Sequence, residues 1–285
     1  MPEKMICPVC FHHCSLSEGQ TGRCRARGNR NGRVVSLSYG RVTSVALDPV
    51  EKKPFNRWQS GKFILSVGTF GCNLSCAFCQ NAAISQVGAE TETDSLPSER
   101  LAEIAEELVP RGNIGAAFTY NEPLVGWEYV RDTARIARGA GLMNVLVTNG
   151  TAEPWVLEAV GPYIDAMNID LKGFSERYYS RVLGGNLETV KAFISRAVQL
   201  AHTELTTLIV PGENDSEEEM RALAGWVAGL KDAEGRVVGP EIPLHVSRFF
   251  PRFRMKDRPA TDPQLVYRLA DTAREKLKYV YTGNC

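Results

Sequence analysis

The sequence predicts an α/β fold, a partial (β/α)6 TIM-like barrel that follows a small Cys-rich N-terminal module. From about residue 62, strand-like apolar runs alternate with helix-like stretches, which is typical of parallel β/α architecture. Unusual polar residues directly follow several of these runs, and in α/β barrels the active site is built at the carboxyl ends of the strands. The alternation alone also allows a doubly wound open sheet, so the position of the polar residues is what favours a barrel.

The alternation places six strands and six helices in the barrel. The predicted strands are 63–69, 114–120, 143–149, 165–171, 204–210 and 242–247. The predicted helices lie near 97–109, 125–139, 153–160, 187–201, 216–230 and 262–277. Before them, residues 34–47 predict two short strands that form a hairpin around Tyr39-Gly40. We therefore expect a Cys-rich, metal-binding module with a β-hairpin over residues 1–55 and the barrel over residues 56–285.

The composition of the 285-residue chain excludes several classes of protein. Apolar residues make up 44% and charged residues 23%, which is ordinary for a globular chain and excludes disorder for most of it. The 33 basic residues balance the 33 acidic ones, which argues against a dedicated nucleic-acid-binding protein or a polybasic membrane anchor. No apolar run reaches the roughly 18 residues of a membrane span, and the N-terminus lacks a signal-peptide pattern. We expect a cytoplasmic protein without a membrane partner.

The most specific motif is a loop that carries three cysteines directly after the first predicted barrel strand. It reads Cys72-Asn-Leu-Ser-Cys76-Ala-Phe-Cys79, a C-x3-C-x2-C spacing. Three thiolates can hold three irons of a [4Fe–4S] cluster and leave the fourth iron open for chemistry. The alternatives are a zinc site with a fourth ligand from elsewhere and buried cysteines that bind no metal.

The loop resembles the signature of the radical S-adenosylmethionine (SAM) superfamily, over roughly residues 60–283. Within it, the chain is similar to the group of pyruvate formate-lyase activating enzyme and other glycyl-radical-enzyme activases. It is more similar still to the radical SAM enzyme of the AmmeMemoRadiSam system. Besides the N-terminal cysteines, the segments that carry this resemblance are Asp48–Pro54, Gly71–Asn81, Thr119–Pro123, Asn168–Gly173, Leu244–Pro251 and Tyr279–Asn284.

The resemblance implies a role for each residue of the site. Cys72, Cys76 and Cys79 are the catalytic cluster ligands, and SAM binds the open iron through its amino and carboxylate groups. The implied SAM-binding residues are Phe78, Asn121, Glu122, Pro123, Thr148, Asp170, Lys172 and His245. Asn121 stands where the family has a glycine. A monovalent cation is also implied next to Thr148, Asp170 and His245, although Val147 stands where activases often have an aspartate.

The resemblance implies an oxidoreductase that works under anaerobic conditions with a reductant such as flavodoxin or ferredoxin. The reduced cluster would cleave SAM to methionine and a 5′-deoxyadenosyl radical, which then abstracts hydrogen from a substrate. Two substrates are open: a protein or small molecule modified together with AmmeMemo partner proteins, which we favour slightly, or a backbone glycine of a partner enzyme. A third hypothesis, of another class, is a non-catalytic iron–sulfur or zinc protein for binding or electron transfer.

A second set of cysteines lies in a polar segment that has too few apolar residues to fold by itself. Cys7, Cys10, Cys14 and Cys24 are enough to form one tetrahedral metal site, and metal binding would fold residues 1–33. Zinc and a second iron–sulfur cluster are both open at this point, as are redox-active or unligated thiols. A second iron–sulfur cluster would have a function that zinc lacks, because it could relay electrons.

Overall fold

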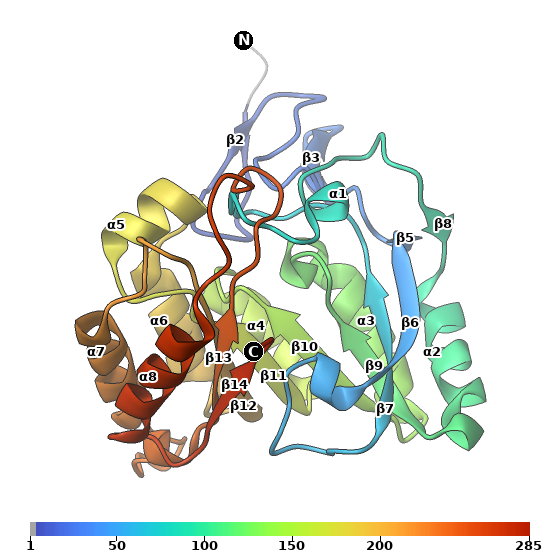
Figure 1. The fold of residues 1–285 in the computed structure, drawn as a ribbon. Coiled ribbons are helices and arrows are strands. Elements are labelled where there is room, and N and C mark those ends of the chain that lie inside the picture. The colour runs from blue at the N-terminus through green and yellow to red at the C-terminus, as the bar shows by residue number, and fades with distance from the viewer. Residues whose placement is uncertain (1–3) are drawn as a thin grey trace.

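The computed structural model describes residues 4–285, which form an open barrel with a smaller lobe above it (Figure 1). The strands are β1 (Met5–Ile6), β2 (Ser15–Leu16), β3 (Arg27–Arg30), β4 (Arg33–Ser36), β5 (Arg41–Val42), β6 (Ser44–Pro49), β7 (Phe63–Gly68), β8 (Asp94–Ser95), β9 (Asn113–Phe118), β10 (Met143–Thr148), β11 (Ala166–Asp170), β12 (His202–Ile209), β13 (Leu244–Arg248) and β14 (Val280–Gly283). The α-helices are α1 (Ala82–Ser85), α2 (Ser98–Glu107), α3 (Trp127–Gly139), α4 (Pro154–Val160), α5 (Glu176–Tyr178), α6 (Leu187–Ala197), α7 (Glu217–Ala228) and α8 (Pro263–Arg274). Short 3-10 turns are η1 (Val50–Lys52), η2 (Val109–Arg111), η3 (Pro123–Gly126), η4 (Gly161–Tyr163) and η6 (Gly239–Glu241), and η5 (Tyr179–Leu183) is a π-helix.

The barrel is one 8-stranded sheet in the order β14-β13-β12-β11-β10-β9-β7-β6. All neighbours from β7 to β14 are parallel, and β6 joins β7 antiparallel at the edge. The six predicted strands are β7, β9, β10, β11, β12 and β13, so the predicted α/β barrel is confirmed. Two edge strands, β6 and β14, extend it, and they do not pair with each other, which leaves the barrel open on one side.

The sheet packs against helices on its outer face and encloses a second apolar cluster inside. The outer cluster unites strand residues such as Leu146 and Ile169 with helix residues such as Val130 and Ile194. The inner cluster contains no residue of a long helix, and it consists of Val50, Phe55, Ile64, Ala117, Val145 and Ala166. The chain before β7 therefore folds back and fills the lower end of the barrel interior, which we call the lumen.

Strand register sorts the lumen-facing side chains into rows, because directly paired residues of neighbouring strands project to the same face. The lowest row consists of Ser66, Ala117, Val145 and Ala166. The row above it contains Val147, Asn168 and Glu204. The top row contains Asp170, Thr206, His245 and Tyr281. The strand side chains of these rows are thus mostly apolar at the bottom, Ser66 excepted, and polar toward the carboxyl ends of the strands.

Several of the long helices start at a side-chain cap that fixes their position relative to the sheet. Asn186 accepts from the Thr189 N–H at the start of α6, and Ser216 accepts from the Glu219 N–H at the start of α7. Asp262 caps α8 through the Gln264 N–H. Such caps satisfy N–H groups that have no partner within the first helical turn.

The hairpin predicted within residues 34–47 is wrong. The structure forms a hairpin earlier, between β3 and β4, whose turn residues Asn31 and Gly32 have φ of 54° and 70°. An Asn-Gly pair adopts such positive φ values readily and is a stronger two-residue turn signal than Tyr39-Gly40. Residues 41–42 instead pair with β8, and residues 44–49 pair with β7, so the main sheet begins within the segment 1–55. Among residues 4–285, no helix is long and apolar enough to cross a bilayer.

Candidate active site

The three-cysteine loop follows β7 at the carboxyl end of the barrel and is held by neighbours on two sides. The Cys72 N–H donates to the Cys24 carbonyl at 3.1 Å, which ties the loop to the N-terminal module. The Ser75 N–H donates to the Leu183 carbonyl of η5 at 2.8 Å. Gly71 has φ of 89°, and a Cβ at this position would overlap the Cys24 carbonyl, so glycine is required there. The loop shape therefore depends on contacts with chain segments far away in sequence.

The thiols of this loop are free and enclosed. Cys76 is buried, Cys72 and Cys79 are half-buried, and none of the three is in a disulfide. Burial raises the pKa of the Cys72 thiol well above its ordinary value and that of Cys76 to about 11. The Leu74 N–H and Asn149 Nδ2 lie 3.4 and 3.6 Å from Cys72 Sγ. These donors suit a metal-bound thiolate, which accepts hydrogen bonds more strongly than a neutral thiol.

The surroundings of the loop fit a [4Fe–4S] cluster. Among residues 4–285, no three His, Cys, Asp or Glu side chains are arranged around a position for one metal ion. A cluster does not need that arrangement, because each thiolate binds a different iron. The Tyr178 hydroxyl next to Cys76 is buried and has no hydrogen-bond partner in the described chain, and a cluster sulfur could supply one.

Asn121 connects the end of β9 to the loop. Its Nδ2 lies 3.2 and 3.0 Å from the Phe70 and Gly71 carbonyls, and its Oδ1 accepts from the Thr69 N–H at 3.1 Å. The Asn121 side chain therefore supports the backbone directly before Cys72. Pro123, two residues later, is buried at the start of η3.

Glu122 lies fully buried between β9 and β10. Its carboxylate accepts hydrogen bonds from the Leu124 N–H at 3.0 Å, the Thr148 hydroxyl at 2.7 Å and the Asn149 N–H at 2.7 Å. Burial raises the pKa of Glu122 to about 7 although these three donors oppose the shift. The carboxylate thus fixes the loop that follows β10, where Asn149 reaches Cys72.

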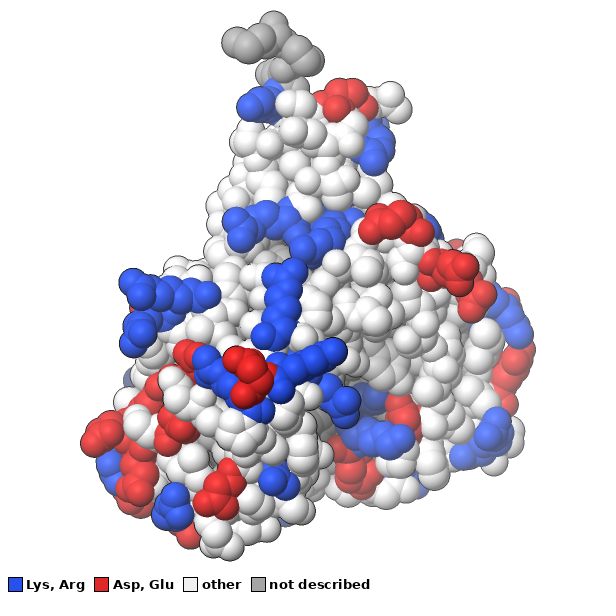
Figure 2. Space-filling view, turned by 45° about the horizontal axis from the view of Figure 1, so that its top comes forward, with Lys and Arg blue, Asp and Glu red and all other residues white. Residues whose placement is uncertain are grey.

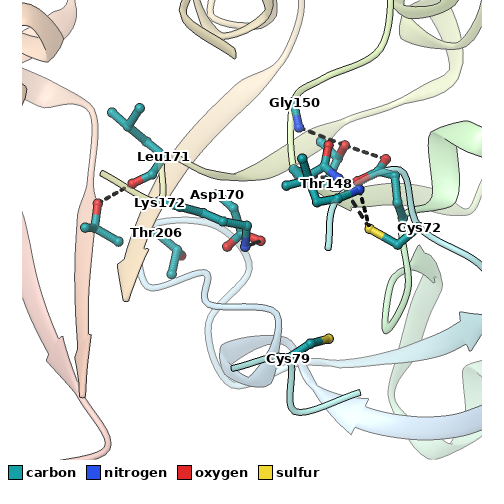
Figure 3. A network of polar contacts seen from close by, with 12 residues as sticks. Cys72, Cys79, Thr148, Gly150, Asp170, Leu171, Lys172 and Thr206 are labelled. Carbon is teal, nitrogen blue, oxygen red and sulfur yellow. Dashed lines mark hydrogen bonds and ion pairs between the residues drawn. The ribbon is translucent and has the colours of Figure 1, made fainter. Parts of the chain in front are cut away.

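Asp170 and Lys172 form an ion pair that faces the same space as Cys72 and Cys79 (Figure 3). Lys172 Nζ lies 2.7 Å from Asp170 Oδ2, and the Lys172 side chain is only 16% exposed. Burial opposes the charge of Lys172, but Asp170 and Cys76 together raise its pKa above the ordinary value. An ammonium with free N–H groups next to the cysteines is suited to bind a carboxylate.

Two further predicted residues border this space from β13 and the cysteine loop. His245 lies in the top lumen row, where its Nε2 is 2.7 Å from Glu204 and its ring stacks on Tyr281 at 5.4 Å. Phe78 is buried and meets Phe249 edge to face at 6.3 Å. The structure therefore brings all of the predicted barrel residues to one end of the barrel.

The four N-terminal cysteines lie near one another and next to the barrel loop. The Cys7 N–H donates to the Cys14 carbonyl at 2.9 Å, and the Cys10 thiol borders Cys7, Cys14 and Asn73. Cys24 is buried, and burial raises the pKa of its thiol to about 11. These thiols form a second group within the N-terminal module, and Cys24 and Asn73 connect it to the cysteine loop.

Sequence reasoning did not include three residue groups of this region. Asn149 belongs to the site through Cys72, and its position directly after a strand was the available signal. Glu204 was missed although it is a charge within an apolar strand run, which indicates a buried, paired carboxylate. Tyr178 and Tyr179 follow the Asp170-Leu-Lys172 motif closely, but no periodicity distinguishes a hydroxyl that points into a site from one in the core.

Comparison with known proteins agrees with this geometry. Residues 66–224 match the model of the radical SAM superfamily. A Methanocaldococcus jannaschii protein of uncharacterized function is 38% identical over 99% of this chain and 81% of its own length. The pyruvate formate-lyase-activating enzyme of Clostridium pasteurianum is 21% identical over 73% of this chain and 89% of its own length.

Solved structures share the fold. A domain of pyruvate-formate lyase-activating enzyme from Bacteroides vulgatus superposes with a TM-score of 0.50 and 15% identity, over 59% of this chain and 98% of that one. Streptococcus suis SuiB bound to S-adenosylmethionine gives a TM-score of 0.57 and 14% identity, over 75% of this chain and 48% of that one. The match over residues 66–224, together with the loop of three free thiols, leads to one conclusion: this chain belongs to the radical SAM superfamily.

Proposed function

We propose that this protein reductively cleaves SAM at a [4Fe–4S] cluster held by Cys72, Cys76 and Cys79. The observation that carries the proposal is that three free thiols on one loop share a space with the Lys172–Asp170 pair. When bound, the cluster supplies one electron to SAM, whose C5′–S bond breaks to give methionine and a 5′-deoxyadenosyl radical. Hydrogen abstraction from the substrate then yields 5′-deoxyadenosine and a substrate radical.

The chain's own residues bind, orient and shield the reactants. Lys172 pairs with the SAM carboxylate, because its ammonium faces the cysteines and has N–H donors that Asp170 does not use. The Glu122 carboxylate holds the loop after β10, and Asn121 holds the loop before Cys72. Phe78 and Phe249 provide an apolar border for the adenine. His245 borders the same space, whereas the Thr148 hydroxyl donates to Glu122 beside it, and a monovalent cation next to these residues stays a prediction.

Two substrate classes remain, as the sequence predicted. The first is a protein or small molecule modified together with AmmeMemo partner proteins, which the N-terminal cysteine run favours. The second is a glycine of a partner enzyme, which the relation to pyruvate formate-lyase-activating enzyme favours. Transfer of deuterium from labelled candidates into 5′-deoxyadenosine separates the two, because each class donates a different hydrogen.

The surface supports an acidic redox partner such as flavodoxin or ferredoxin. Figure 2 shows Lys and Arg side chains gathered in the centre of the face that carries the N-terminal module. Arg252, Arg254 and Lys256 are exposed, and the Arg254 N–H donates to the Ala77 carbonyl of the cysteine loop at 2.8 Å. Complementary charge near the cluster would steer such a reductant to this face.

We also propose that Cys7, Cys10, Cys14 and Cys24 hold a metal, either zinc or a second iron–sulfur cluster. Their thiols are free and near one another, and thiolates select these two kinds of centre. Among residues 4–285 no three such side chains surround one metal position, so zinc would require the four thiols to move together, whereas a cluster binds each thiolate through a different iron. Because Cys24 and Cys72 share a backbone hydrogen bond, a cluster at this site would be positioned to pass electrons to the barrel. A division at residue 55 and a cytoplasmic, anaerobic setting stay predictions.

The decisive experiment measures 5′-deoxyadenosine formed by anaerobically reconstituted protein with dithionite and SAM. The variant in which Cys72, Cys76 and Cys79 are all replaced by Ala should form none, while its circular dichroism stays that of a folded α/β protein. Cys285→Ala, which removes an exposed thiol, is the matched control and should keep the activity. SAM cleavage that persists in the triple variant, or is absent from the wild type, would refute the proposal.

A further inference from the structure

The lumen floor is formed by residues 48–57, which we call the floor segment. Asp48 pairs with Ile64 of β7, and Ile64 belongs to the inner apolar cluster, so Asp48 projects into the lumen. Asn168 Nδ2 donates to the Pro54 carbonyl at 2.7 Å. Glu204 accepts from the Asn56 and Arg57 N–H groups at 3.1 and 2.8 Å. Lumen residues of two strands therefore hold the floor segment in one position.

Lys53 of the floor segment is a buried ammonium with spare hydrogen-bonding capacity. Its side chain is 4% exposed, and within residues 4–285 its Nζ has one acceptor, Asp48 Oδ2 at 2.9 Å. The Tyr120 ring centroid lies 4.6 Å from the same Nζ. An ammonium carries three N–H donors, of which one meets Asp48 and another faces the Tyr120 ring, so at least one has no acceptor in the described chain. Burial lowers the pKa of Lys53 although Asp48 opposes the shift, so its surroundings undercompensate the charge.

A second unsatisfied donor lies on the same side of the lumen. Ser66 is fully buried in the lowest row, and its hydroxyl has no partner with full hydrogen-bond geometry among the described residues, although it lies close to the Tyr120 hydroxyl. It faces Tyr120, whose hydroxyl donates to Asp48 at 2.7 Å. Buried polar groups are normally satisfied, so two such donors on one wall indicate an acceptor that comes from outside the chain.

The backbone is shaped to keep Tyr120 in this position. Tyr120 has φ of 72°, a strained value for a non-glycine residue. Its ring lies over Gly68, where a Cβ would approach the ring to 2.9 Å. Strain of this kind persists only where surrounding contacts hold the residue in place. The packing around Tyr120 therefore holds its side chain against Asp48 and Lys53.

The charges near Lys53 favour an anion. Asp48 is the partner of both Lys52 and Lys53, so two ammonium groups share one carboxylate. The Lys172–Asp170 pair at the mouth of the lumen also joins a lysine ammonium with spare donors to an aspartate, and there the expected ligand is the SAM carboxylate. No cofactor role uses the second pair, which lies lower in the barrel at the β6 edge of the sheet.

We infer that Lys53 and Ser66 bind an anionic group, a carboxylate or a phosphate, of a small-molecule substrate that enters the lumen below SAM. The inference rests on the proposed SAM cleavage and names the chemical class of its substrate. The bound anion accepts the spare Lys53 and Ser66 donors and neutralises the excess positive charge. Because the floor segment closes the lower end of the barrel, Lys53 is reached from inside the lumen, which favours a small molecule over a folded protein.

The test measures how much a substrate accelerates 5′-deoxyadenosine formation by the reconstituted holoenzyme. The probes are the retained and unretained anion-exchange fractions of a low-molecular-weight extract from cells that produce the protein. The retained fraction should accelerate the wild type, and Lys53→Met should lower the acceleration ratio about tenfold or more, the scale of a lost charged hydrogen bond. Prior phosphatase treatment abolishes the effect if the group is a phosphate and leaves it if the group is a carboxylate.

Lys52→Met is the matched control, because Lys52 contacts the same carboxylate but its side chain is 66% exposed. It should keep the acceleration. If Lys53→Met does not fold, Ser66→Ala replaces it: the cluster-free chain should melt at a higher temperature, because an unsatisfied hydroxyl is removed, and the acceleration should fall. A structural role for Ser66 alone would not produce both effects.

Several results would overturn the inference. One is acceleration only by the unretained fraction, or only by the macromolecules removed when the low-molecular-weight extract is made. Another is acceleration by no fraction. The third is an acceleration ratio that is unchanged from the wild type in both Lys53→Met and Ser66→Ala. Unstimulated SAM cleavage by the wild type is read in the same assay. If unstimulated cleavage is observed together with any of these results, only the anion site is refuted. If unstimulated cleavage is absent, the proposed function is refuted.

Discussion

Replacing Glu204 by glutamine tests whether one buried carboxylate holds the barrel floor and His245 together. Glu204 is fully buried and accepts from the Asn56 and Arg57 N–H groups, and His202 and His245 contact its two oxygens at 3.0 and 2.7 Å. Burial alone would raise the pKa of Glu204, but these donors outweigh it and lower the pKa from 4.5 to about 2. Glutamine keeps the shape but removes the charge and one acceptor.

The size of the effect follows from this pKa. At about 1.4 kcal/mol per pKa unit, a fall from 4.5 to about 2 favours the ionised folded form by about 3 kcal/mol. Because the pKa is lowered on folding, this stability is complete above about pH 4.5 and is lost as the pH falls toward 2. Glu204→Gln should therefore lower the free energy of unfolding by about 3 kcal/mol at pH 7, and the difference from the wild type should shrink below pH 4.5.

Urea denaturation of both proteins between pH 7 and pH 3 measures this difference. Glu106→Gln, on the exposed side of α2, is the control and should change the stability by less than about 0.5 kcal/mol. The floor segment should also become cleavable by protease near residue 57 in Glu204→Gln only. A difference that is absent at pH 7, or that stays constant down to pH 3, would show that the carboxylate charge does not hold the floor.

Four further changes test the site. Lys172→Ala should weaken SAM binding by about 1.5–3 kcal/mol in equilibrium titration, while exposed Lys276→Ala does not, and an unchanged affinity would contradict the carboxylate role. Tyr178→Phe should stabilise the cluster-free chain by about 1 kcal/mol and shift the potential of the reduced cluster, because it removes an unpaired hydroxyl; a less stable chain would mean that the hydroxyl is already bonded. Gly71→Ala should destabilise the chain by about 2 kcal/mol or more in thermal unfolding, whereas Gly225→Ala, in open space on α7, should not, and equal effects would dismiss the contact with Cys24. Metal analysis of the Cys72, Cys76 and Cys79 triple variant should find about one zinc or about four irons per chain, held at the N-terminal cysteines. If the variant contains neither metal and residues 1–33 still resist protease, the N-terminal metal site is ruled out.

The barrel could be predicted because its information is local. Each of the six predicted strands is a short apolar run between helix-like stretches, so its type and approximate bounds follow from residues close in sequence. The same holds for Cys72, Cys76 and Cys79, whose spacing alone indicates a cluster loop. The edge strands are different: β14 is only Val280–Gly283, and the partner of β6 lies beyond the loop that contains Phe55.

The rest of the site depends on register, which the sequence does not display. Asp48, Lys53, Ser66 and Tyr120 come from three separate segments and meet only because β6, β7 and the end of β9 lie side by side. Glu204 similarly reaches the floor segment across the lumen. Side chains that work together from distant segments leave no periodic pattern, so only the folded structure identifies them.

The backbone hydrogen bond from Cys72 to Cys24 limits how the protein can be divided or recombined. Removing the N-terminal segment would strip the acceptor from the Cys72 N–H, the Ala26 side chain from Gly71, and the buried Arg27 partner from Glu128. A cut at residue 55 would also take away β6 and the floor ammonium at Lys53. Chimeras that transplant this barrel into a relative therefore need to carry residues 22–27 and 44–57 with it. A shortened chain would lack these contacts around the cysteine loop and the lumen. Its activity would therefore not represent that of the full chain.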